Sequence, residues 1–249
     1  MVLKYRHEGR LLTLTIDRPE AHNALDAELL GELSAALDRA ETDDGVRVVA
    51  IAGRAGVFCS GADLAGSGGG TPADTARLYF RTLRRFTTSP RIIVSVVDGT
   101  VQAGGVGLIA ASDYVLCSDS STFRLPEVLI GLIPACVLPF LIRRIGVHGS
   151  QMLSLTAQKL DARRALELRL VDQVAPDVND ALRRFVLSVD RIPEQAVASL
   201  KSYVQQLAPV TDREEELAVA RIAALMEDPK SLGLVQELVH HGLWQEGRR

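Results

Sequence analysis

Residues 101–127 contain two features that a site for acyl chemistry needs. Closely spaced glycines, Gly104, Gly105 and Gly107, precede a short apolar run, and a glycine backbone can approach a ligand closely because it has no Cβ. If a helix begins there, its first N–H groups lack internal partners and can donate to an anion. Glu127 follows in an apolar setting, which raises the pKa of a carboxyl by disfavouring its charged form. The stretch predicts a donor turn beside a proton-transferring carboxylate.

A second turn of small residues could supply another backbone donor. The apolar run 46–53 has the composition of a buried strand, and the segment 57–64 after it, VFCSGADL, contains Ser60, Gly61 and Ala62. Small residues at the end of a strand leave backbone N–H groups accessible. Two donors directed at one oxygen would stabilise the charge that develops on an acyl carbonyl when a base removes the adjacent proton. The two turns therefore predict enolate chemistry.

The composition excludes several classes of function. Of 249 residues, 47% are hydrophobic and 24% are charged, with a net charge of −3 and a pI near 6.0. A nucleic-acid binder would carry a basic surplus, and no apolar run is long enough to cross a bilayer. The N-terminal residues lack the apolar segment of a signal peptide. We expect a cytoplasmic protein with no nucleic-acid or membrane partner.

No metal site or disulfide is expected. The five histidines share no ligand spacing, although His240 and His241 are adjacent. The cysteines, Cys59, Cys117 and Cys136, are scattered along the chain, which favours reduced and buried thiols. Cys59 and Cys136 lie in regions where one of them could contact a ligand, but packing as small apolar side chains is the simpler interpretation.

The hydrophobic pattern predicts an α/β core followed by helices. Residues 4–8 and 11–16 are predicted as two strands around Gly9, and the apolar runs 46–51, 92–97 and 114–117 predict three more. Asp26 is a good N-cap for a helix to about Thr42, and strand, helix and strand in this order indicate a right-handed crossover. Helical patterns follow at 135–145, 148–156, 161–168 and 179–189. The pattern divides the chain into an α/β core, residues 1–192, and a helical C-terminal region, residues 193–249.

A glycine-rich loop and a basic helix lie between the two turns. Residues 66–72, GSGGGTP, lack the Lys-Ser/Thr ending of a phosphate-binding loop, so a mobile entry loop is the better interpretation. The helix predicted at 74–88 carries arginines three or four positions apart, Arg77, Arg81, Arg84 and Arg85. They form either a solvated basic face or a docking surface for an acidic partner, with Arg81 and Arg84 as the candidates.

Three ordered motifs carry a family resemblance. FCSGADL, GGVGLIAASDY and FRLPEVLIGLIP occur in this order, between IDRPEAHNAL and LTAQKLDARRALELRLVDQV. Together they resemble the crotonase (enoyl-CoA hydratase/isomerase) family over residues 3–245. The resemblance implies an α/β fold whose core is a spiral of ββα turns, with C-terminal helices that pack in a homotrimer or hexamer.

The resemblance also implies roles for individual residues. The two oxyanion donors of the family correspond to the backbone N–H groups of Ala62 and Gly104, and the glutamate of its PE motif corresponds to Glu127. Hydratases of the family carry a second glutamate where this chain has Gly107, a departure that counts against simple addition of water. The resemblance places further motif residues around the substrate: Gly61, Asp63, Leu64, Gly105 and Cys136.

A narrower resemblance comes from residues 125–146, LPEVLIGLIPACVLPFLIRRIG. This segment is similar to the crotonase-like dehydratases of polyketide β-branching, which remove water from a 3-hydroxy-3-methylglutaryl group on an acyl carrier protein. It implies that Glu127 acts as both base and acid in forming a 3-methylglutaconyl thioester, with no cofactor beyond the phosphopantetheine arm. Ala65 stands where many CoA-using relatives carry a basic residue for a CoA phosphate, which favours a carrier protein over CoA. The alternatives are an enoyl-CoA isomerase, a hydratase, and a catalytically idle binding module.

Overall fold

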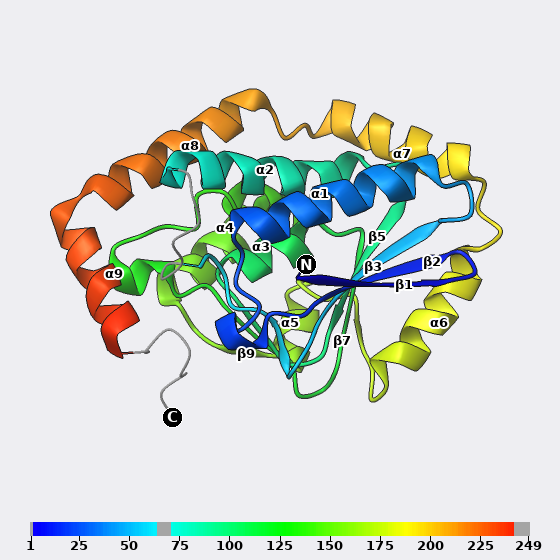
Figure 1. Cartoon of the computed structure of the whole chain (residues 1–249), viewed down its shortest axis with the longest axis horizontal. Coiled ribbons are helices and arrows are strands. Elements are labelled where there is room, and N and C mark those ends of the chain that lie inside the picture. Colours follow the sequence, from blue (N-terminus) through cyan, green and yellow to red (C-terminus); the bar gives the residue numbers. More distant parts are fainter. Residues whose placement is uncertain (1, 64–70, 242–249) are drawn as a thin grey trace.

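Two sheets and the helices around them make up the computed structural model, which describes residues 2–63 and 71–241 (Figure 1). The strands of the first sheet, in spatial order, are β1 (Leu3–Glu8), β2 (Leu11–Ile16), β3 (Val48–Gly53), β5 (Ile92–Val97), β7 (Tyr114–Cys117) and β10 (Gln173–Val174). Those of the second are β4 (Val57–Cys59), β6 (Thr100–Gln102), β8 (Thr122–Arg124) and β9 (Leu160–Asp161).

The helices occupy the positions between and after these strands. They are α1 (Ala27–Thr42), α2 (Pro72–Thr88), α3 (Gly104–Ala111), α4 (Leu138–Thr156), α5 (Ala162–Glu167), α6 (Val178–Val189), α7 (Glu194–Leu207), α8 (Asp212–Glu227) and α9 (Pro229–His241). Two short 3-10 turns, η1 (Pro19–Ala21) and η2 (Glu127–Ile130), complete the described elements. Within the described ranges, no helix is both long and apolar enough to cross a membrane.

The chain visits the two sheets alternately. Successive turns run through β3, β4 and α2, then β5, β6 and α3, then β7, β8 and α4, so each turn gives one strand to each sheet. Equivalent strands of successive turns pair in parallel in both sheets. This arrangement is the ββα spiral that the family resemblance implies.

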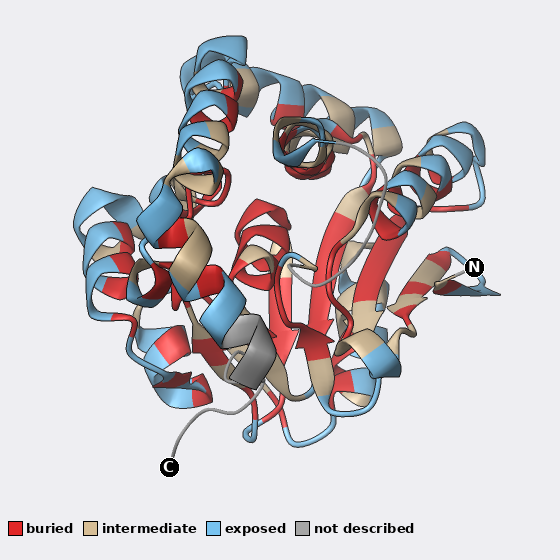
Figure 2. Cartoon of the chain, turned by 60° about the vertical axis from the view of Figure 1, so that its left-hand side comes forward, coloured by how far each residue is buried: buried red, intermediate tan, exposed pale blue. Residues whose placement is uncertain are grey.

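The long elements form where apolar patterning and capping predict them. The Asp26 side chain accepts a hydrogen bond of 2.8 Å from the backbone N–H of Leu29, and this bond begins α1. Leu30 and Leu33 on the same helix are fully buried. Figure 2 shows the pattern throughout the chain, with buried strands inside and helices exposed on their outer sides. Burial of this apolar surface is the main force that stabilises the fold.

Two predictions of local structure need correction. The helices predicted at 135–145 and 148–156 are one element, α4, which starts later and is interrupted at Gly146 by a φ of 79°. The helix predicted from residue 74 begins at Pro72, because the Thr71 hydroxyl and the Asp74 carboxylate form a capping box. The glycine-rich loop predicted at 66–72 lies largely outside the described residues.

The C-terminal region is helical, as predicted, and packs on the core of its own chain. Helix α8 lies alongside α2 (Figure 1). The buried Lys201 side chain of α7 donates to the Phe86 carbonyl at 2.9 Å and to Asp113 at 2.7 Å. From α9, the Ser231 hydroxyl donates to the Gly131 carbonyl at 3.3 Å. The trimer or hexamer and the division at residue 193 stay predictions.

Candidate active site

Three parallel strands of the second sheet bring the candidate groups together. Strand β6 pairs in parallel with both β4 and β8. The carboxyl ends of neighbouring parallel strands meet at one edge of a sheet, where ligands commonly bind. From that edge β4 leads to Ala62, β6 leads to Gly104, and β8 leads to Glu127. Segments far apart in the sequence therefore meet at one place.

The first turn leaves one backbone donor unused. The Leu25 N–H donates to the Gly61 carbonyl at 2.7 Å, and the Asp63 N–H donates to the Leu25 carbonyl at 2.9 Å. Between these two bonds, the N–H of Ala62 donates to no backbone carbonyl in the described part of the chain. Gly61 has a φ of +100°, and a Cβ on it would lie 2.6 Å from the Cβ of Ala103. The first turn thus touches the second.

The second turn begins a helix on a strained residue. Ala103 has φ 47° and ψ −120°, a conformation that L-residues rarely adopt and that is found mainly at functional sites. Gly104 is the first residue of α3, so its N–H has no acceptor within the helix. A Cβ on Gly105 would lie 2.7 Å from the Cys59 carbonyl oxygen, so this glycine allows α3 to pack tightly on β4.

A cavity of about 610 Å³ opens beside the two turns. Of the residues predicted to surround a substrate, it is lined by Ala62, Asp63, Gly104, Glu127 and Cys136. Gly61 and Gly105 are not among the lining residues but support the turns by close packing, and Leu64 lies outside the described residues.

The C-terminal region also reaches the cavity, through Ile222 and Met226 of α8. The Cys136 thiol is buried, which raises its pKa to about 12 and keeps it protonated. Among the described residues, no group of three or more His, Cys, Asp or Glu is placed to hold a metal ion.

Glu127 differs from the other carboxylates of the cavity. It starts η2, is 8% exposed, and its Oε2 atom has no hydrogen-bond partner among the described residues. Burial raises its pKa to about 7. Asp26 and Asp63 are instead both paired with Arg18, at 2.8 and 3.4 Å. Glu127 is therefore able to accept and to donate a proton near neutral pH.

Tyr79 is a cavity residue that the sequence analysis did not identify. It lies on α2, is 8% exposed, and its hydroxyl donates a hydrogen bond to the Gly104 carbonyl. A Cβ added to Gly107 would lie 2.0 Å from this hydroxyl. In sequence, Tyr79 is one of several apolar residues on the buried side of a helix, so its position gave no sign of a role at the site.

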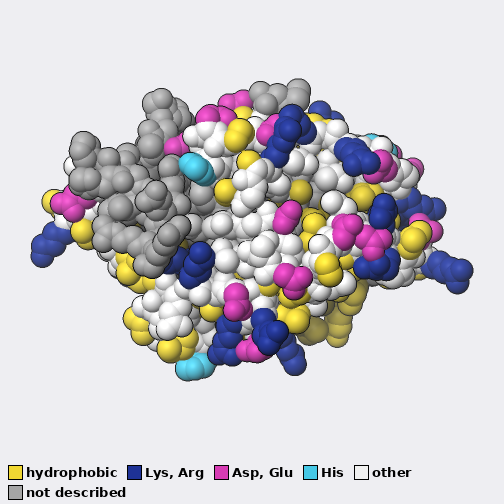
Figure 3. Space-filling view, turned by 90° about the horizontal axis from the view of Figure 1, so that it is seen from below, with side chains coloured by type: hydrophobic (Ala, Val, Ile, Leu, Met, Phe, Trp, Pro, Cys, Tyr) yellow, Lys and Arg dark blue, Asp and Glu magenta, His cyan; other side chains and the backbone are white. Residues whose placement is uncertain are grey.

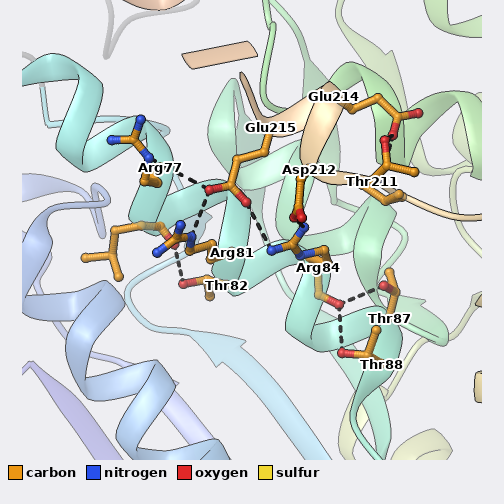
Figure 4. A network of polar contacts seen from close by, with 12 residues as sticks. Arg77, Arg81, Thr82, Arg84, Thr87, Thr88, Thr211, Asp212, Glu214 and Glu215 are labelled. Carbon is orange, nitrogen blue, oxygen red and sulfur yellow. Dashed lines mark hydrogen bonds and ion pairs between the residues drawn. The ribbon is translucent and has the colours of Figure 1, made fainter. Parts of the chain in front are cut away.

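The arginine row of α2 is engaged within the molecule (Figure 4). Arg81 contacts the Glu215 carboxylate of α8 at 2.8 Å, and Arg84 contacts Asp212 at 2.6 Å and Glu215 at 3.1 Å. Arg77 lies 3.9 Å from the same Glu215, which is buried. Arg85 pairs instead with Asp38 and Glu41 of α1, so the row joins α2 to both α8 and α1 and is not a free basic face. Carrier docking at Arg81 and Arg84 stays a prediction.

The chain matches one family over most of its length. The enoyl-CoA hydratase/isomerase family model matches residues 6–237. Bacillaene synthase dehydratase PksH of Bacillus subtilis (strain 168) is 30% identical over 240 residues, covering 94% of this chain and 92% of that protein. Carnitinyl-CoA dehydratase of Proteus mirabilis (strain HI4320) is 29% identical over 231 residues, covering 90% of this chain and 87% of that protein.

Solved structures agree with the sequence matches. The crystal structure of the pksH protein of Bacillus subtilis has a TM-score of 0.88 at 28% identity and covers 96% of this chain and 97% of that chain. An enoyl-CoA hydratase from Mycobacterium avium has a TM-score of 0.87 at 29% identity and covers 96% of each chain. By its sequence and its ββα spiral, the chain belongs to the enoyl-CoA hydratase/isomerase, or crotonase, family.

Proposed function

We propose that this enzyme dehydrates a 3-hydroxy-3-methylglutaryl thioester on an acyl carrier protein to the 3-methylglutaconyl thioester. The observation that carries the proposal is the state of Glu127. Among the described carboxylates that line the cavity, it alone has no cationic partner, and burial raises its pKa to about 7. A group with this pKa can remove a proton and return it in one catalytic cycle at neutral pH.

The proposed reaction begins with proton removal beside the thioester. The thioester oxygen accepts hydrogen bonds from the N–H groups of Ala62 and Gly104, and Glu127 removes a proton from C2. Electrons of the broken C–H bond move onto that oxygen, where each donor contributes about 3–4 kcal/mol of stabilisation by comparison with a measured oxyanion hole. No metal is required for this step.

The second step expels water. The enolate electrons return to form the C2=C3 double bond as the C3–O bond breaks, and Glu127 gives its proton to the leaving hydroxyl. The carboxylate is thereby restored, and water is the only by-product. A single carboxylate that serves both steps requires the proton and the hydroxyl to leave from the same face of the substrate.

Two further observations support dehydration. Bacillaene synthase dehydratase PksH is similar to this chain over nearly its whole length. At position 107, a Cβ would lie 2.0 Å from the Tyr79 hydroxyl, so with Tyr79 in its present position a second carboxylate does not fit there, which supports a mechanism in which Glu127 serves both steps.

Enoyl-CoA chemistry is the second candidate. The 2,3-dehydroadipyl-CoA hydratase of Escherichia coli (strain K12) is 32% identical over 174 residues, covering 68% of this chain and 67% of that protein. Hydration is the reverse of the proposed reaction, and isomerisation needs a single carboxylate such as Glu127. An idle binding module would have no need of an unpaired buried carboxylate, which is costly to maintain.

Mass spectrometry of the carrier-bound substrate tests the proposal. We expect 3-hydroxy-3-methylglutaryl carrier protein to lose one water when incubated with the wild-type enzyme, and to stay unchanged with Glu127→Gln. Crotonyl-CoA in a parallel reaction measures hydration. Hydration of crotonyl-CoA without dehydration of the carrier-bound substrate would replace the proposal with the second candidate.

A further inference from the structure

We propose that Tyr79 positions the Gly104 donor, and that position 107 is a glycine because the Tyr79 hydroxyl occupies the space beside it. This inference rests on the proposed function, because it concerns the N–H group that would stabilise the enolate oxygen. It assigns to a buried aromatic residue of α2 a role in arranging the first turn of α3.

The first observation is the contact itself. The Tyr79 side chain reaches from α2 to α3, and its hydroxyl donates to the carbonyl of Gly104. Tyr79 and Gly104 both line the cavity. Burial is the main cause that raises the pKa of Tyr79 well above its usual value, and the charge of Glu127 adds to the shift. The phenol therefore stays protonated and keeps its hydrogen to donate.

The second observation is that Tyr79 supplies the side-chain anchor at the start of α3, where the other anchors among the described residues are backbone bonds from the Ala103 N–H to the Arg124 carbonyl at 3.0 Å and from the Val106 N–H to the Ala103 carbonyl at 2.9 Å. No side chain caps this eight-residue helix, and Ala103 before it is in a strained conformation. Strain of this kind persists only where surrounding contacts enforce it. In the described part of the chain, the Tyr79 hydroxyl makes the one side-chain hydrogen bond to residues 103–107. This bond holds the Gly104 carbonyl, and the bond from the Val106 N–H to the Ala103 carbonyl holds the peptide that carries the Gly104 N–H, so Tyr79 fixes the second of the two peptides that orient Gly104.

The third observation links Tyr79 to Gly107. A Cβ at position 107 would lie 2.0 Å from the Tyr79 hydroxyl oxygen, a distance that no pair of atoms tolerates. The next contacts would be the ring carbon that bears the hydroxyl and the Leu83 Cδ1 atom, both at 3.1 Å. Without the hydroxyl, a methyl group at position 107 would need shifts of only a few tenths of an ångström. The hydroxyl at 79 and a side chain at 107 thus exclude each other.

A spectroscopic experiment tests the positioning directly. Butanoyl carrier protein labelled with carbon-13 at the carbonyl binds as a thioester but has no C3 hydroxyl to lose. Hydrogen bonds from the two donors lower the carbonyl stretching frequency when this ligand binds to the wild-type enzyme. We expect Tyr79→Phe to reverse a large part of that shift at saturating ligand. The control Tyr203→Phe, at an exposed position of α7, leaves the shift unchanged.

The two negative results of this experiment have different meanings. If the wild-type enzyme shows no lowering of the frequency, the donor assignment is wrong, and the proposed function falls with the inference. If the wild-type shift is present and Tyr79→Phe retains all of it, the positioning role alone is wrong.

A double-mutant cycle provides the second test. We expect Tyr79→Phe to lower kcat about tenfold with KM within about twofold, since one donor is misplaced in the transition state. Gly107→Ala displaces the same hydroxyl and lowers kcat to a similar degree. Because both changes break one contact, the double variant is expected to be no slower than the worse single variant. Independent, multiplying losses would overturn the link between the two positions. Circular dichroism confirms folding, and if Gly107→Ala does not fold, the spectroscopic test still decides.

Discussion

At the scale of single residues, catalysis and stability make opposite demands on Glu127. Its carboxylate is buried without a hydrogen-bond partner on Oε2, and this raises the pKa to about 7. Desolvation makes the charged form costly, but it also tunes the group to exchange protons at neutral pH. The residue is therefore expected to be essential for turnover and unfavourable for stability.

The first prediction concerns turnover. Glu127→Gln keeps the shape of the side chain but cannot accept the C2 proton, so kcat is expected to fall at least about a hundredfold. Steady-state kinetics on the carrier-bound substrate provides the measurement. Glu167→Gln, at an exposed position of α5, is the matched control and is expected to retain full activity. Turnover of Glu127→Gln close to that of the wild type would rule out Glu127 as the base.

The second prediction concerns pH. Because the free enzyme must hold Glu127 as a carboxylate, kcat/KM is expected to rise as pH increases through about 7 and then level off. Initial rates in buffers of constant ionic strength would show this profile. A flat profile between pH 5 and about 8 would contradict the assignment, because the rate would then not depend on any group with a pKa near 7.

The same pKa predicts a change in stability. The folded pKa of about 7 lies above the ordinary 4.5, so the folded state binds more protons than the unfolded state between these values, and its stability falls as pH rises. The variant Glu127→Gln has no carboxyl group at this position, so its stability does not fall in this pH range for this reason. At pH 8 it is expected to exceed the wild type by roughly 3 kcal/mol in free energy of unfolding, with the difference absent at pH 4. Urea unfolding at both pH values measures it, and an equal difference at the two would contradict the buried carboxylate.

At the scale of elements, the parallel strands β4, β6 and β8 determine where the reacting groups lie. The two donor turns touch through Gly61 and Ala103, so a change in one turn reaches the other. The contact explains why Gly61 matters although it does not line the cavity. The two candidate donor turns therefore form one packed unit at the edge of the second sheet.

The third prediction tests this unit at the first turn. Ala62→Pro removes a backbone N–H that donates to no carbonyl in the described chain, so a loss of activity beyond any loss of stability would come from the missing donor. We expect kcat to fall about a hundredfold, the lower end for one oxyanion donor. Ala62→Gly, which changes the same residue but keeps its backbone N–H, is the matched control. Full turnover in a folded Ala62→Pro enzyme would remove Ala62 from the site.

The sequence predicted the long elements, and it named residues that the structure brings to one cavity, for identifiable reasons. Asp26 caps a helix with a regular apolar face, and the motifs around Ala62, Gly104 and Glu127 carry the family resemblance. Strands β4, β6 and β8 have three residues each, too few for a periodic pattern, so the sheet that positions the site was not predicted. Tyr79 was missed because helical spacing does not distinguish an aromatic residue of the core from one that contacts a turn.

At the scale of the whole molecule, the proposed carrier protein would need a surface on which to dock. On the face in Figure 3, the visible Lys and Arg side chains are interspersed with Asp and Glu, without a continuous basic area. Arg81 and Arg84 of α2 contact Glu215 and Asp212 of α8. These ion pairs hold α8 against the core, and α8 also lines the cavity.

The fourth prediction compares the two carriers of the acyl group. We expect a higher kcat/KM for the carrier-bound substrate than for the same group on CoA, since Ala65 supplies no charge for a CoA phosphate. The variant Arg81→Glu with Arg84→Glu is expected to lower the carrier-bound rate more than the CoA rate, most clearly at low salt. Its control is Glu215→Gln, which loosens the same helix pair but leaves both arginines positive. If the ratio of the carrier-bound rate to the CoA rate is the same in both variants, this result would count against docking at this helix.

The central claim is that a proton is taken beside the thioester carbonyl and water is lost from the same substrate. A 3-hydroxy-3-methylglutaryl carrier protein with two deuterium atoms at C2 tests it most directly, with mass spectrometry of the product. Removal of one C2 deuterium together with the hydroxyl gives a product that has lost HDO and retains one deuterium. We predict this product with the wild-type enzyme and none with Glu127→Gln. Loss of H2O with both deuterium atoms retained, or the same product from Glu127→Gln, would contradict the claim.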